Sequence, residues 1–225
     1  MFKLSTIVPK DLLIDNNSSI NTDVMNFLSI DCSTDIGSLF VKTKNKTFSQ
    51  VLQSDKSNND LLMKQILDFF NENNIKFGDI SNIFVNQGPG NFSGLRGSLA
   101  IVKGVSLAKN LKLFGYNTFL WSCVNFFNKE NTIYSFIEFR KKYFVKKFDK
   151  NLTSISKIKE ITTDEIIKNY DSKFKVIPRS MIKNFDEKIL KLNNLNIVNL
   201  DHNELEFLQL KGLLSEKLIN PLYLS

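Results

Sequence analysis

The stretch GPGNFSGLR at residues 88–96 decides how this sequence folds, because it joins a short apolar strand pattern to a long helical one. Pro89 fixes its own φ, and the two glycines beside it can adopt backbone angles that other residues avoid. We therefore expect the strand predicted over 80–85 to end in a tight turn, and a helix to begin near Asn91 or Ser93.

The residues alone leave two roles open for this turn. Free N–H groups at the start of the helix would bind a phosphate or carboxylate. Alternatively, the glycines only allow the strand and helix to pack closely. The stretch is not a Walker A loop, since no Gly-Lys-Ser/Thr follows, and it lacks the G-x-G-x-x-G order of a dinucleotide-binding turn.

The helix after the turn carries a stripe of small residues. Ala100, Gly104 and Ala108 recur every four residues and include both alanines of the chain, and Gly97 lies one turn earlier. A glycine inside a helix costs about 1 kcal/mol relative to alanine, so these positions need a reason. Small side chains let another helix approach closely. That neighbour is either the helix predicted over 61–70, which is the default, or a helix of another chain.

The periodicity around this stretch predicts a mixed sheet with helices packed on it. In the first half we expect strands over 26–31, 37–41, 48–52, 80–85 and 113–116, with helices over 59–70 and 92–110. In the second half we expect a hairpin of 132–139 and 143–148, strands over 173–177 and 197–200, and helices over 163–170 and 205–218.

This order predicts two lobes. We expect residues 25–119 to form the first and residues 120–225 a smaller second lobe, whose last helix, 205–218, packs back on the first. Residues 1–24 are polar and are expected to be an extension that is flexible or absent from the natural product.

Composition excludes several classes of site. A single histidine, His202, and two separated cysteines, Cys32 and Cys123, cannot build a His/Cys zinc cluster or a disulfide framework, so a reducing cytosol is the expected compartment. The sequence also lacks an apolar run of membrane-spanning length and the apolar region of a signal peptide.

The net charge of +7 suggests an anionic partner, but it needs discounting. Only Arg96, Arg140 and Arg179 among the 30 basic residues are arginines. A bias that replaces Arg by Lys throughout explains most of this charge, and a true basic binding face is the alternative.

Two segments resemble the TsaB (YeaZ) family. Residues 27–34 (FLSIDCST) are similar to its opening strand, which typically reads IDTST, and residues 88–96 to its signature loop, GPGSFTGLR. The terminal PLYL at 221–224 resembles its PVYL, and IEFR at 137–140 is a looser match to IDAR. The resemblance covers Met25 to Leu224 and is strong to about Tyr116.

This resemblance implies an actin/Hsp70-like (ribonuclease H-like) ATPase fold with a reduced second lobe, and a chain that is not a competent ATPase. It implies a non-catalytic partner of a TsaD-like enzyme, which places threonylcarbamoyl on the tRNA adenosine beside the anticodon. A TsaE-like ATPase would join the pair, and tRNA would be met through the complex. No cofactor, metal or catalytic residue is expected in this chain, and no membrane contact.

The resemblance also implies where the partner binds, because the first two helices of each paralogue form a four-helix bundle. A homodimer through the same helices is an alternative. The predicted interface residues are Leu62, Ile66, Phe69, Gly97, Ala100, Gly104 and Ala108, and the signature-loop residues are Gly88, Pro89, Gly90, Phe92, Ser93, Gly94 and Arg96.

The rival class is an ATP-binding enzyme of the same fold, a kinase or ATPase that uses the Gly88–Gly94 loop for phosphate. The turn after Asp31 argues against it, because it has no glycine before Gly37 and adds the carboxylate of Asp35. Asp31 and Ser33 are therefore expected to stabilise the turn rather than to catalyse.

The second hairpin departs from the family pattern. Lys141-Lys142 replaces a glycine-containing turn, and Glu138 stands where aspartate is usual. The basic cluster Arg140, Lys141, Lys142, Lys146 and Lys147 either contacts tRNA backbone or forms a solvated hairpin face, and the second role is favoured.

Overall fold

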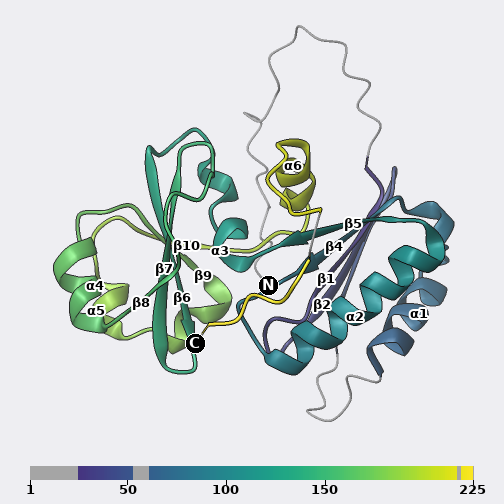
Figure 1. Ribbon diagram of the computed structural model, residues 1–225, viewed down its shortest axis with the longest axis horizontal. Coiled ribbons are helices and arrows are strands. Elements are labelled where there is room, and N and C mark those ends of the chain that lie inside the picture. Colours follow the sequence, from purple (N-terminus) through teal and green to yellow (C-terminus); the bar gives the residue numbers. More distant parts are fainter. Residues whose placement is uncertain (1–24, 53–60, 217–218, 225) are drawn as a thin grey trace, which may run out of the picture.

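Two five-stranded mixed sheets form two lobes in the computed structural model (Figure 1), which describes residues 25–52, 61–216 and 219–224. The predicted extension, 1–24, and the predicted beginning of the helix over 59–70 lie outside the described residues. No helix in the described part of the chain is long and apolar enough to cross a membrane.

The first sheet has the strand order β3-β2-β1-β4-β5. In the middle, β1 (Phe27–Asp31) pairs antiparallel with β2 (Ser38–Lys42) and parallel with β4 (Asn82–Asn86). β3 (Thr47–Val51) extends the meander antiparallel to β2, and β5 (Lys112–Tyr116) runs parallel to β4. This is the meander followed by strand–helix–strand crossovers that the sequence predicts.

Two helices cover one face of this sheet (Figure 1). They are α1 (Leu62–Glu72) and α2 (Phe92–Lys109). Side chains alternate along a strand, so Leu28 and Ile30 of β1 pack in the core beneath these helices, while Phe27 packs in the core on the other face. The outer faces of α1 and α2 therefore point away from the second lobe.

The second sheet has the strand order β10-β9-β6-β7-β8. Its centre is the hairpin of β6 (Thr132–Phe139) and β7 (Lys142–Asp149), with β8 (Lys159–Ile161) antiparallel at one edge. On the other side, β9 (Lys175–Pro178) pairs parallel with β6, and β10 (Leu195–Val198) pairs parallel with β9.

Short helices complete this lobe and the connection to it. α3 and α4 differ in how they begin: Asn117 caps the first through Leu120 N, whereas Thr162 and Glu165 form a capping box for the second. These short helices are α3 (Thr118–Trp121), α4 (Thr163–Tyr170), α5 (Glu187–Leu190), and the 3₁₀ segments η4 (Val124–Phe126) and η5 (Arg179–Asn184). A further 3₁₀ segment, η3 (Phe77–Asp79), lies between α1 and β4 of the first lobe.

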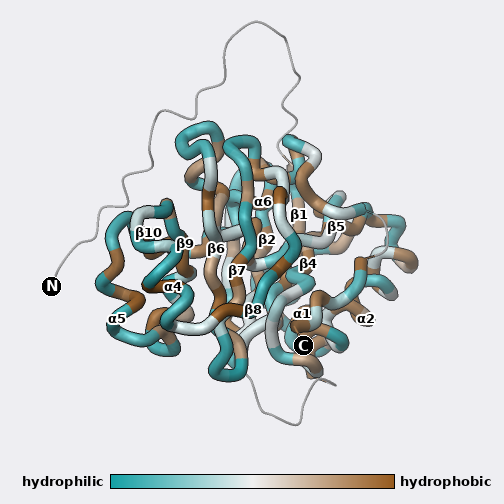
Figure 2. The backbone as a smooth tube through the Cα atoms, turned by 60° about the vertical axis from the view of Figure 1, so that its left-hand side comes forward, coloured by the Kyte–Doolittle hydropathy of each residue, from teal (hydrophilic) through white to brown (hydrophobic). Residues whose placement is uncertain are grey.

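One apolar core runs through both lobes. It begins at Phe27 and Phe84 of the first sheet and continues to Ile133 and Val176 of the second. The tube coloured by hydropathy shows hydrophobic stretches along the central strands of both sheets (Figure 2). The lobes are thus packed against one another rather than joined by a bare linker.

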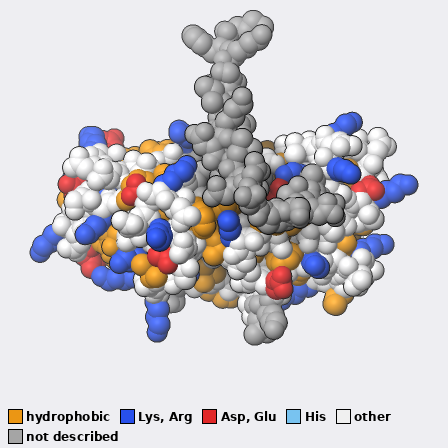
Figure 3. Space-filling model, turned by 90° about the horizontal axis from the view of Figure 1, so that it is seen from above, with side chains coloured by type: hydrophobic (Ala, Val, Ile, Leu, Met, Phe, Trp, Pro, Cys, Tyr) orange, Lys and Arg blue, Asp and Glu red, His pale blue; other side chains and the backbone are white. Residues whose placement is uncertain are grey.

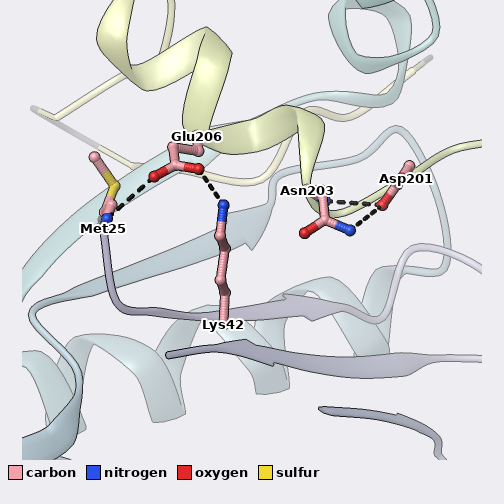
Figure 4. A network of polar contacts seen from close by, with 5 residues as sticks. All are labelled: Met25, Lys42, Asp201, Asn203 and Glu206. Carbon is pink, nitrogen blue, oxygen red and sulfur yellow. Dashed lines mark hydrogen bonds and ion pairs between the residues drawn. The ribbon is translucent and has the colours of Figure 1, made fainter. Parts of the chain in front are cut away.

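The segment after β10 crosses back to the first sheet. Its helix, α6 (Glu204–Leu210), places Glu206 where the carboxylate accepts hydrogen bonds from Lys42 Nζ and, at 3.1 Å, from Met25 N (Figure 4). Just before α6, Asp201 Oδ1 accepts from the backbone N–H of Asn203 at 2.9 Å. The contacts of Glu206 tie α6 to β2 and to the residues before β1.

Several predicted elements need correction. The helix predicted over 205–218 ends at Leu210, because Gly212 adopts φ +68° and turns the chain; residues 217–218 lie outside the described part. The strand predicted over 197–200 lies at 195–198, and that predicted over 173–177 at 175–178. The short elements β8, α3 and α5 were not expected. The two sheets span 27–116 and 132–198, and the lobe boundary at 119/120 remains a prediction.

Candidate functional site

The signature loop connects β4 to α2 and packs tightly against the turn that follows β1. A Cβ at position 90 would lie 1.9 Å from the carbonyl oxygen of Ser33, and one at position 94 would lie 2.4 Å from that of Cys32. Gly88 precedes a cis bond to Pro89 and has φ +106°, which favours glycine. These glycines are therefore required for the close approach of backbone to backbone.

Three N–H groups of the loop have hydrogen-bond partners within the protein. Gly88 N donates to Asn86 Oδ1 at 2.8 Å, and Asn91 N donates to the carbonyl oxygen of Ser33 at 2.8 Å. Ser93 N donates to the Asn91 side chain at 3.2 Å, which caps α2 within the range where the sequence predicts that this helix begins. Because these donors have partners, the geometry favours the packing role of the loop over the binding of an anion.

A buried asparagine holds this region together. Asn86, which is fully buried, donates through Nδ2 to Asp31 Oδ1 at 3.1 Å, to Ser33 Oγ at 3.2 Å and to Thr118 Oγ1 at 3.1 Å. Asp31 Oδ1 also accepts from Ser33 N at 2.8 Å. Asp31 and Ser33 thus stabilise the turn. No pattern in the sequence identifies Asn86 as the centre of this network.

A cleft between the lobes lies beside this network. It has two connected parts of about 710 and 420 Å³, which share Ser33, Thr34 and Met181 in their walls. Arg140 lines the first and Arg179 the second, but Asp31, Asp35 and Glu138 line the same cleft. The mixture of charges, with carboxylates on the turn after β1, disfavours a triphosphate there.

His202 lies at the inner end of the cleft as part of a packed polar cluster. Its Nδ1 is 2.8 Å from Ser29 Oγ and its Nε2 is 3.0 Å from Ser38 Oγ, while its ring stacks on Phe40 at 5.3 Å. Burial lowers the pKa of His202, against the opposing effect of Asp31 and Asp201. Both ring nitrogens are engaged, so the imidazole positions residues 201–206.

The two thiols lie apart and are poor nucleophiles. Burial raises the pKa of Cys32 to about 12, helped by the Asp31 carboxylate, and burial likewise raises the pKa of Cys123 to about 12. Within the described residues, no group of three or more His, Cys, Asp or Glu side chains could hold a metal ion.

Glu204 leads to a pH-dependent prediction. Burial raises its pKa to about 7; Asn125 Nδ2 donates to its Oε1 at 2.6 Å, and its Oε2 has no partner among the described residues. Unfolded Glu204 releases its proton near 4.5, so between pH 4.5 and 7 the folded state binds more protons and stability falls as pH rises, by up to about 3 kcal/mol.

We expect Glu204→Gln to unfold like the parent protein at pH 4.5 and to be more stable by about 1–3 kcal/mol at pH 8, in urea titrations at each pH. His202 titrates in both proteins, so its contribution cancels in the difference. A stability difference that stays constant across this range would show that Glu204 keeps an ordinary pKa in the folded state.

The structure corrects three of the predicted interface residues. Leu62, Ile66 and Phe69 face the sheet and are at most 6% exposed. They form the chain's own core and are not available to a partner. The exposed face of α1 instead carries Lys64, Leu67, Asp68 and Asn71, which recur at spacings of three and four residues.

The small-residue stripe of α2 is open to solvent. Ala100, Gly104 and Ala108 are exposed, Gly97 is partly buried, and no atom lies within 4 Å of a Cβ built on Gly104. The default expectation that α1 packs against this stripe is therefore wrong at Gly104. Leu99 and Val102 pack in the core beneath the sheet, Leu95 is buried beside Gly88, and Leu107 projects outward at 85% exposure.

The basic cluster of the second hairpin does not form one face. Arg140 and Lys141 adopt φ of 53° and 62° at the hairpin turn, a backbone region that favours glycine. Lys146 and Lys147 are consecutive on β7 and so point to opposite faces, next to the rings of Phe148 and Tyr134. Lys and Arg side chains are spread over both lobes on the face shown in Figure 3.

Two lobes, each a five-stranded mixed sheet with flanking helices, agree with the fold class that the resemblance implies. YeaZ from Pseudomonas aeruginosa has this fold, with a TM-score of 0.64 and 15% identity over 89% of this chain and 100% of that chain. A protein described as uncharacterized, with similarity to peptidase YEAZ from Pseudomonas aeruginosa, superposes with a TM-score of 0.65 and 14% identity at the same coverage. Both likenesses concern the fold.

Sequence comparison adds two matches. The "tRNA threonylcarbamoyladenosine biosynthesis protein TsaB" of Buchnera aphidicola subsp. Baizongia pistaciae (strain Bp) is 33% identical over 86 residues, which cover 37% of this chain and 38% of that relative. The family model "TsaD: tRNA N6-adenosine threonylcarbamoyltransferase" matches residues 50–138, a range that includes α1, the signature loop and α2. Both matches concern part of the chain: they make it similar to a TsaB protein and, over a region that contains the signature loop, to the TsaD family model.

Proposed function

We propose that this chain is a non-catalytic partner subunit in the threonylcarbamoyladenosine modification of tRNA in the cytoplasm. It binds a TsaD-like catalytic subunit through the outer faces of α1 and α2, and a TsaE-like ATPase joins this complex. The chain acts on tRNA indirectly, through the complex. The similarity to the TsaB protein of Buchnera supports a role in this modification. The observation that carries the partner role is the open face of α2 around Gly104.

The surface of this helix pair supports a helix–helix contact. Gly104 leaves space for a close neighbour, and Leu107 of α2 and Leu67 of α1 are exposed apolar side chains at 85% and 41%. Exposed apolar side chains next to a small-residue groove are typical of surfaces that a partner helix covers. The opposite faces of both helices are used by the sheet, so only the outer faces remain for a partner.

The geometry of the signature loop supports the proposal that this chain does not use ATP. Gly90 and Gly94 are needed for the close approach to Ser33 and Cys32, and the N–H groups of Gly88, Asn91 and Ser93 have protein partners. Calorimetry of the isolated chain with ATP and magnesium tests this point. Binding at micromolar concentration would favour the rival, an ATP-binding enzyme that uses this loop.

Gly104→Leu is the direct test of the interface. We expect it to weaken binding to the organism's own TsaD-like protein at least about a hundredfold, or about 3 kcal/mol, because a leucine fills the space of the neighbouring helix. The free chain should gain up to about 0.8 kcal/mol, since leucine favours a helix over glycine. Co-purification and titration measure the first effect, and urea unfolding the second.

Gly78→Leu is the matched control, because Gly78 in η3 also has no atom within 4 Å of a Cβ and lies outside α1 and α2. It should bind like the parent protein. Equal binding by Gly104→Leu and the parent would refute the interface. No binding by the parent itself would refute the partner role.

A further inference from the structure

Three side chains form an exposed stack at the beginning of α2. The rings of Phe92 and Tyr223 lie 5.1 Å apart between centroids at an interplanar angle of 29°, and the Arg96 guanidinium carbon lies 4.4 Å from the Phe92 ring centroid. Phe92 and Tyr223 are 45% and 48% exposed. Tyrosine and arginine are the residue types that most often anchor protein interfaces, so an ordered stack of this kind is a candidate contact.

The segment 219–224 holds Tyr223 in place. Leu222 N donates to the Gln87 carbonyl oxygen at 2.7 Å, Gln87 Nε2 donates to the carbonyl oxygen of Asn220 at 2.8 Å, and Ile219 is 4% exposed in the core beside the sheet. The C-terminal segment thereby runs alongside the signature loop toward the beginning of α2 (Figure 1). A side chain positioned in advance loses little entropy when a partner covers it.

The stack continues the proposed interface. Arg96, Ala100, Lys103, Gly104 and Leu107 are all exposed and recur at spacings of three and four residues, so they lie on one face of α2. Arg96 is the first of them. A partner helix that lies along Gly104 and Leu107 therefore meets the stack at the end of this face.

Charge indicates what kind of surface covers it. α2 carries Arg96, Lys103 and Lys109 and no acidic residue, and Arg96 has no ion-pair partner in the described part of the chain. Two copies of α2 packed together would bring like charges close, which disfavours a second copy of this chain on this face. A surface with a carboxylate and an apolar side chain fits it instead.

We propose that the TsaD-like partner covers the Tyr223–Phe92–Arg96 stack, so that the C-terminal segment takes part in binding and a partner carboxylate pairs with Arg96. This inference rests on the proposed function. It extends the contact beyond the two helices to a residue more than a hundred positions further along the chain.

The test compares two variants in titrations of the full chain with the organism's own TsaD-like protein. Tyr223→Ala and Arg96→Glu should each weaken binding at least about tenfold, and added salt should reduce the effect of Arg96→Glu. The controls are Ile155→Ala, whose side chain is equally exposed at 48%, and Lys150→Glu, an exposed charge reversal in the second lobe. Both controls should bind like the parent protein, and all four variants should unfold at the parent's urea midpoint.

The outcomes distinguish a failure of this inference from a failure of the proposed function. If Gly104→Leu loses the partner while Tyr223→Ala and Arg96→Glu keep the parent affinity, the stack lies outside the interface and this inference is wrong although the proposed function stands. If the parent protein does not bind the partner, the proposed function fails first. If the variants instead disrupt a homodimer measured by sedimentation and leave partner binding intact, the stack serves a second copy of this chain. Arg96→Glu replaces no core residue, so it remains decisive if Tyr223→Ala is unstable.

Discussion

Gly90→Ala is expected to destabilise the protein by about 3 kcal/mol or more, which is the upper end of the usual cost of overpacking. The new Cβ would lie 1.9 Å from the Ser33 carbonyl oxygen, a backbone atom that cannot rotate away. The turn cannot retreat without breaking the hydrogen bond from Asn91 N to the same oxygen and the contacts of Asn86. A shift of the urea midpoint at unchanged slope measures the loss.

The same substitution at Gly104 is the control, because it also adds one methyl group but meets no atom within 4 Å. It should stabilise the protein by about 0.8–1 kcal/mol, since alanine favours a helix over glycine. If Gly90→Ala costs less than about 1 kcal/mol, the loop is free to move and the packing explanation of the signature glycines is wrong.

The sequence distinguishes these glycines only in part. It shows that 88–96 is a turn between a strand and a helix, because Pro89 and its neighbours exclude regular structure, and the turn lies where it was predicted. It does not show whether the N–H groups face outward to an anion or inward. That choice depends on the turn after β1, which is more than fifty residues away and approaches to within hydrogen-bond distance only in the fold.

The sequence contains the evidence against placing the apolar stripe of α1 in a partner interface. Leu62, Ile66 and Phe69 follow a helical period, and one apolar stripe on a surface helix normally faces the chain's own core. The partner face is then the opposite one, with Lys64, Leu67 and Asp68. On α2 the same reasoning holds, because Leu95, Leu99 and Val102 supply a buried stripe and leave the small residues on another face.

The burial of polar side chains is not predicted by the sequence pattern. Asn86 and Lys175 belong to types that are usually solvated, and nothing in their neighbours marks them as buried. Lys175 donates from Nζ to the carbonyl oxygens of Tyr170, Asp171 and Lys173 at 2.6, 2.8 and 2.7 Å. Such a site needs the end of α4 and the beginning of β9 to meet around one side chain, which is a property of tertiary structure.

Lys175→Met should therefore destabilise the protein strongly, by about 3 kcal/mol, although methionine has nearly the same length and suits a buried site. Burial lowers the pKa of Lys175, with Asp171 opposing, yet only the ammonium form offers three donors for the three carbonyl oxygens. Methionine removes the cost of burying a charge but takes a donor from all three oxygens, two of them in the last turn and cap of α4. The Tyr170 oxygen keeps a second partner, the Lys173 N–H at 3.0 Å.

Lys173→Met is the matched control, because Lys173 is exposed and its side chain takes no part in this cap. It should change stability by no more than about 0.5 kcal/mol. Urea unfolding of both variants, followed with a probe of helix content, measures the difference. If Lys175→Met and Lys173→Met unfold at the same midpoint, the relief of burying the ammonium group equals the loss of its three hydrogen bonds, and Lys175 fixes where α4 ends without stabilising the lobe.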